Sequence, residues 1–128
     1  MQETESIRLV EGYLDALAAR DFAAVRSRLS DTGFRYSSPI AEFSDPEAFI
    51  ASMEGVGAIL HKIAVVHRFA NDDVVCHVLD FTINLETRRT RRVVQLARVQ
   101  DDKIVELEVI FDATTFHRMI VTDEESRP

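Results

Sequence analysis

The stretch YLDALAARDFAAVRSRLSD, residues 13–31, joins two amphipathic helices at its central aspartate. Apolar residues before that aspartate recur at alternating steps of three and four, as on one face of a helix: Ile7, Val10, Leu14 and Leu17, with Tyr13 beside them. Asp21 can accept the free backbone amides of the next turn and so begin a second helix. That helix has its own apolar stripe, so both helices must cover another layer.

Residues 34–38 alternate in side-chain direction, with Tyr36 and Ser38 on one side, and Pro39 ends this short strand. From residue 59 onward β-branched and aromatic residues predominate. Turn signals divide that part into four candidate strands, near residues 60–69, 74–85, 91–100 and 103–111. Their short connections predict an antiparallel meander.

A third helix is expected over SDPEAFIASMEG. Ser44 or Asp45 would cap it, Pro46 suits its first turn, and Gly55 and Gly57 are expected to end it. The order is then helix, helix, strand, helix and a four-stranded meander, which predicts an α+β fold whose helices cover one face of a sheet.

Composition and charge exclude several classes of function. With 46% hydrophobic residues, the chain can form one domain, expected over residues 1–120, and the polar end predicts a flexible tail over residues 121–128. No apolar run is long enough to span a membrane, and MQETES does not begin a signal peptide, so a cytoplasmic protein is expected. The net charge of -7 opposes binding to nucleic acid or anionic membranes.

The basic run ETRRTRRVV departs locally from this acidic character, with Arg88, Arg89, Arg91 and Arg92 close together. It is either a solvated hairpin tip or a patch that binds an anionic ligand. The acidic net charge of the whole chain favours the hairpin tip.

No cofactor or metal is expected. The candidate metal ligands His61, His67, Cys76 and His77 lack the spacing that builds a metal site. Cys76 lies in the middle of a strand, where a buried and inert thiol is expected.

The order of elements, together with YLDALAARDFAAVRSRLSD and DDKIVELEVIFDATTF, resembles the nuclear transport factor 2-like superfamily over residues 5–117. Within it, the chain is similar to the SnoaL-like and ketosteroid isomerase-like proteins. The resemblance implies a cystatin-like fold: a strongly curved antiparallel sheet wrapped around the N-terminal helices, forming a cone with an internal cavity. It also implies a homodimer through the outer sheet face. The superfamily contains isomerases, cyclases, epoxide hydrolases, dehydratases and noncatalytic proteins, so fold alone does not give activity.

Two hydrogen-bond donors follow from the resemblance. Tyr13 precedes Asp21 by eight residues, as does the isomerases' tyrosine that donates to the developing oxyanion. Gln95, three residues before Arg98, stands where the isomerases carry a second donor, a protonated aspartate. Each is either a cavity residue or an interior group satisfied by its neighbours.

Two acidic positions of the superfamily are not acidic here. The isomerases' base directly precedes a proline, but Ser38 precedes Pro39, and a serine hydroxyl has no basic form near neutral pH. Epoxide hydrolases and cyclases often carry an inward aspartate near the end of the last strand, where this chain has Val109. Asp112 remains, but strand alternation places it with Glu108, away from the cavity.

His67, His77 and Asp80 are the other candidates for a base. A histidine facing the cavity could act near neutral pH, but a satisfied structural histidine is favoured at both positions. Asp80 is expected on the outer side of the sheet.

The expected function is binding of a small, apolar ligand, polycyclic or polyketide-like. The expected ligand-binding residues are Tyr36, Ser38, His77, Val109 and Phe111. As an enzyme, the protein would be an isomerase or cyclase in which Tyr13 and Gln95 polarise a carbonyl and His67 or a bound water is the base. Two alternatives stay open: a noncatalytic ligand-binding or dimeric scaffold protein, and a domain whose cavity is filled and whose outer sheet face binds another protein.

Overall fold

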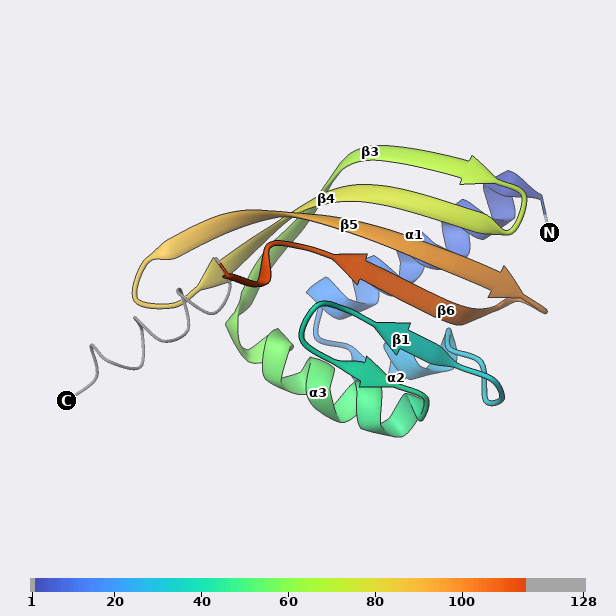
Figure 1. Cartoon of the computed structure of the whole chain (residues 1–128), viewed down its shortest axis with the longest axis horizontal. Coiled ribbons are helices and arrows are strands. Elements are labelled where there is room, and N and C mark those ends of the chain that lie inside the picture. Colours follow the sequence, from blue (N-terminus) through green and yellow to red (C-terminus); the bar gives the residue numbers. More distant parts are fainter. Residues whose placement is uncertain (1, 115–128) are drawn as a thin grey trace.

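In a computed structural model that describes residues 2–114, a curved, unclosed six-stranded sheet bends around its helices (Figure 1). The helices are α1 (Glu3–Ala18), α2 (Phe22–Ser27) and α3 (Pro46–Ile59). The strands are β1 (Arg35–Ser37), β2 (Glu42–Phe43), β3 (Leu60–Asn71), β4 (Val74–Asn84), β5 (Arg88–Gln100) and β6 (Lys103–Ile110). The α+β fold is therefore confirmed. The flexible tail predicted over residues 121–128 lies outside the described residues.

The strand order is β2-β1-β6-β5-β4-β3. The last four strands form the predicted antiparallel meander, and β1 adds to it by pairing parallel to β6. The two-residue strand β2, which the sequence did not predict, pairs antiparallel to β1. Within residues 2–114, no helix is long and apolar enough to cross a membrane.

The corner between α1 and α2 forms as predicted. The Asp21 carboxylate accepts a hydrogen bond from the Ala24 amide at 3.1 Å and caps α2. The guanidinium of Arg20 donates to the carbonyl oxygens of Gly57 and Leu60, at 2.6 Å each. These charge-assisted bonds hold the corner against the end of α3 and the start of β3.

Helix α3 begins at its predicted cap, since the Asp45 carboxylate accepts from the Glu47 amide. The prediction that Gly55 and Gly57 end the helix is wrong, because α3 continues to Ile59. Gly57 has a packing role instead: a Cβ atom there would lie 2.7 Å from Cζ of Phe22. The missing side chain lets α2 and α3 approach.

Bulges help to curve the sheet. β3 changes register between Leu60 and Lys62 and again between Val65 and His67. An extra residue in a strand bends it and increases its twist. The second bulge also turns His67 to the side of its partner Val78, so His67 and Val65 do not share a side as strict alternation would require.

The two glycines of α3 provide a matched stability test. Gly55→Ala adds a Cβ that meets nothing within 4 Å, and should raise the free energy of unfolding by about 1 kcal/mol through helix propensity. Gly57→Ala forces the Phe22 ring to move, and should leave the protein about 1–2 kcal/mol less stable than Gly55→Ala. Urea unfolding measures both. Equal stabilisation by both substitutions would contradict this packing role.

Candidate functional site

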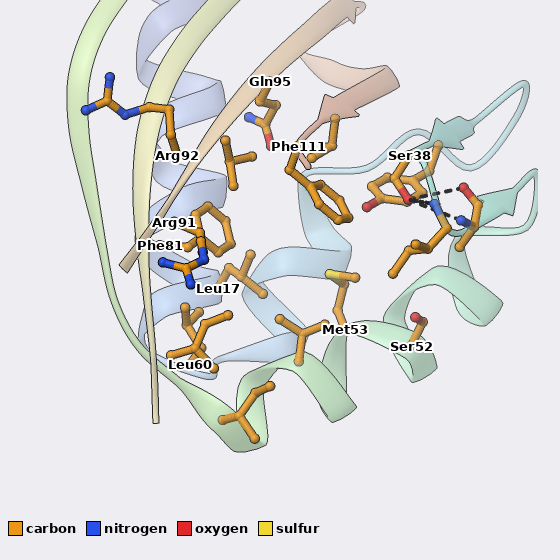
Figure 2. Close-up of a pocket in the computed structure, with 18 of the residues that line it drawn as sticks. Leu17, Ser38, Ser52, Met53, Leu60, Phe81, Arg91, Arg92, Gln95 and Phe111 are labelled. Atoms are coloured by element: carbon orange, nitrogen blue, oxygen red, sulfur yellow. Dashed lines mark hydrogen bonds between the residues drawn. The ribbon is translucent and has the colours of Figure 1, made fainter. Parts of the chain in front are cut away.

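A cavity of about 500 Å³ lies between the inner face of the sheet and helices α1 and α3 (Figure 2). Its wall is mainly apolar, and includes Leu17, Met53, Leu60, Phe81, Val93 and Phe111. Polar side chains at a few points interrupt that wall: Tyr13, Tyr36, Ser38, Ser52, Arg91, Gln95 and Asp112. A space of this size and character suits a small organic ligand. The alternative in which side chains fill the interior is therefore wrong.

Tyr13 comes from the buried stripe of α1 and lines the cavity, with only 2% of its surface exposed. Burial raises the pKa of its hydroxyl well above the ordinary value, and the nearby Tyr36 adds to that shift. The hydroxyl therefore stays protonated, and it can donate a hydrogen bond throughout the neutral pH range.

Gln95 comes from the middle of β5, on the same side as Val93 and Ala97, as predicted. It is 3% exposed, and its side chain points from the strand into the cavity (Figure 2). Its amide nitrogen Nε2 is buried and has no hydrogen-bond partner within residues 2–114. Because an unsatisfied buried donor is costly, this amide favours a ligand that offers an acceptor.

Tyr36 and Ser38 line the cavity where the sequence analysis expects ligand contacts. Burial raises the pKa of the Tyr36 hydroxyl, and the Ser38 side chain partly opposes that shift. The Ser38 Oγ also accepts hydrogen bonds from the amides of Ile40 and Ala41, at 3.3 and 3.2 Å. Ser38 thus holds the turn between β1 and β2, which is a structural role.

The two candidate histidines do not line the cavity. His67 is exposed on the edge strand β3, on the side to which the bulge turns it. His77 is fully buried on β4, and its Nε2 lies 2.8 Å from Oε2 of Glu11 on α1. Burial disfavours ionisation of Glu11, but hydrogen bonds from His77 and Arg68 outweigh it and lower the pKa of that carboxyl. His77 thus pairs with Glu11 where α1 packs against the sheet.

Val109 and Phe111 line the cavity as expected, and Asp112 joins them. Asp112 is exposed like Glu108, with which strand alternation grouped it, but it is also among the residues that line the cavity and so lies at the cavity rim. Asp112 therefore brings a carboxyl group to the rim of the cavity.

Arg91 also lines the cavity, contrary to its prediction as part of a solvated hairpin tip. β5 begins at Arg88, so Arg91 lies within the strand and shares the inner side with Val93. Arg92 is also among the lining residues, but its guanidinium extends away from the others (Figure 2), and its Nε lies 2.7 Å from Oδ1 of Asp80. The sequence did contain a signal for the inward arginine. Counting back from Gln95 in steps of two residues, as strand alternation requires, reaches Arg91.

No metal site is formed by the described part of the chain. Within residues 2–114, no group of three or more histidine, cysteine, aspartate or glutamate side chains is placed to hold a metal ion. Cys76 is a free thiol and is only half-buried, whereas full burial was predicted.

Solved structures, among them those of nuclear transport factor 2-like proteins, share this fold over nearly the whole chain. One of unknown function from Cytophaga hutchinsonii is 24% identical, with a TM-score of 0.75 over 88% of this chain and 94% of that one. An LEH-like epoxide hydrolase from M. tuberculosis is 19% identical, with a TM-score of 0.79 over 97% and 95%. TerC, co-crystallised with polyporic acid, is 18% identical, with a TM-score of 0.79 over 91% and 98%. At such identities the likeness shows the fold alone.

No curated protein matches the chain significantly. The model of the SnoaL-like domain family, in contrast, matches residues 10–107, which include α2, α3 and all of the strands up to most of β6. The matched segment also contains Tyr13 and Gln95 and most of the cavity wall. The chain therefore has the fold of the nuclear transport factor 2-like proteins and belongs to the SnoaL-like domain family.

Proposed function

We propose that the protein binds a small, largely apolar carbonyl compound in its cavity and polarises the carbonyl with Tyr13 and Gln95. The observation that carries this proposal is the buried Nε2 of Gln95, a donor without a partner within residues 2–114 on an otherwise apolar wall. Tyr13 supplies a second buried donor in the same cavity. Hydrogen bonds to a ligand oxygen are strong in such a water-poor space.

These donors suit a reaction that develops negative charge on the carbonyl oxygen. Removal of a proton from the adjacent carbon leaves the electron pair of the C–H bond delocalised onto that oxygen as an enolate. The raised pKa of Tyr13 keeps its hydroxyl a neutral donor to this charge. Return of the proton to another carbon gives an isomerase, and attack of the enolate carbon on a second carbonyl gives a cyclase.

The base in this scheme is Asp112 rather than His67. Ser38 cannot accept the proton, and His67 is exposed outside the cavity. Asp112 is the carboxyl group among the lining residues of the described chain. In the proposed step, its carboxylate takes the proton from the substrate carbon and later returns it.

The second candidate function is ligand binding without catalysis. The observation that favours it is Ser38, whose hydroxyl holds a turn where the isomerases carry their base. Both functions use the same cavity and the same donors, and they differ in whether Asp112 removes a proton. Epoxide hydrolysis has less support, because Val109 replaces the inward acid that the superfamily's hydrolases use.

The donor pair can be tested with the naphthyl ketone 6-propionyl-2-dimethylaminonaphthalene, whose fluorescence reports hydrogen bonding to its carbonyl. Tyr13→Phe and Gln95→Leu should each weaken binding roughly tenfold and shift the emission to shorter wavelength, since each removes one buried donor. Ser52→Ala removes another lining hydroxyl and serves as the control, with an expected change below about twofold. Unchanged affinity and emission in both donor variants would contradict the proposal.

The role of Asp112 can be tested by deuterium exchange at the carbons beside the carbonyl of 2-tetralone, followed by NMR in D2O. The protein should accelerate this exchange, and Asp112→Asn should reduce the acceleration by about a hundredfold or more. Glu108→Gln is the matched control, since Glu108 is exposed on β6, and it should leave the rate unchanged. A protein that binds the ketone without accelerating exchange would favour the noncatalytic function.

A further inference from the structure

We infer that Arg91 forms an anion-binding subsite in the cavity, so that the natural ligand carries an acidic group, a carboxylate or an ionised enol, on its apolar body. The inference rests on the proposed function, because it assumes that the cavity binds a ligand. It narrows that function from apolar carbonyl compounds in general to acidic ones, and it separates this cavity from one built for a neutral polycyclic ketone.

The position of Arg91 follows from the register of the sheet. Arg91 lies opposite Phe81 on β4, and both residues line the cavity. Its guanidinium points into the cavity from the same side of β5 as Gln95 (Figure 2). A cation is thus placed in an apolar space, where its interaction with an anion is weakly screened by water.

The bonding of Arg91 leaves it available to a ligand. Its Nη1 donates to the Thr90 carbonyl oxygen at 3.0 Å, but its buried Nε has no hydrogen-bond partner within residues 2–114. Arg91 also forms no ion pair with another residue of that range, whereas its neighbour Arg92 pairs with Asp80. A guanidinium offers five N–H donors in a planar fork that matches a carboxylate. An acidic ligand would satisfy donors that the described chain leaves open.

The spacing of the polar points adds a constraint on ligand shape. Arg91 and Gln95 are four positions apart, which corresponds to about 13 Å along an extended strand. A ligand that contacts both is therefore elongated, with its acidic group near Arg91 and its carbonyl near Gln95 and Tyr13. Apolar side chains such as Val93, between the two points, would contact the ligand body.

Two fluorescent probes with the same apolar scaffold can test this subsite: 8-anilinonaphthalene-1-sulfonate, an anion, and N-phenyl-1-naphthylamine, its uncharged counterpart. Arg91→Gln should weaken binding of the anion at least tenfold and change binding of the neutral probe by less than twofold. Arg88→Gln removes the same charge from an exposed position of β5 that does not line the cavity, and should change neither probe beyond twofold. Circular dichroism checks that the variants stay folded.

The outcomes separate the inference from the function on which it rests. If the neutral probe binds and Arg91→Gln leaves the anion's affinity unchanged, or weakens both probes equally, the anion subsite is wrong while cavity binding stands. If wild-type protein binds neither probe, cavity binding itself is contradicted. A selective loss of the anion in Arg91→Gln, absent from Arg88→Gln, supports the subsite.

Discussion

The alternation of side chains along β5 is the constraint on which both the core and the cavity depend. The inner side of this one strand carries Ala97 and Val99, which belong to the buried core, and then Gln95, Val93 and Arg91, which line the cavity. Because the period of a strand is two residues, a shift of one position would place this whole set on the outer side. The pairing of β5 with β4 and β6 therefore fixes the core and the polar points of the cavity together.

The sequence predicted those parts of the structure that depend on regular periodicity. Tyr13 follows from the helical stripe of α1, and Gln95 from the alternation of β5, so both could be placed on the inner side before their contacts were known. Residues next to irregular backbone could not be placed in the same way. The bulge before His67 reverses its direction, and Asp112 reaches the cavity rim from beyond the end of β6 at Ile110. Such irregularities depend on tertiary packing and leave no clear pattern in the local sequence.

The start of β5 shows how a boundary error changes a functional interpretation. A strand predicted from residue 91 leaves the arginines before it and at its start in a hairpin tip, where charge is ordinarily solvated. Because β5 begins at Arg88, Arg91 instead lies in regular strand with an inward direction. The prediction for helix α3 contains a similar error. Gly57 does not end the helix; it leaves room for the Phe22 ring.

The cavity combines polar groups at a few points with a mainly apolar wall. Ser38 now stabilises the turn after β1, whereas Tyr13 and Gln95 keep buried donors against an apolar wall. The central claim is that these two donors meet the carbonyl oxygen of a ligand. A crystal structure of the complex with 6-propionyl-2-dimethylaminonaphthalene tests it most directly. The account predicts the carbonyl oxygen within hydrogen-bond distance of Tyr13 Oη and Gln95 Nε2. A carbonyl directed toward solvent, or a ligand bound outside the cavity, would contradict it.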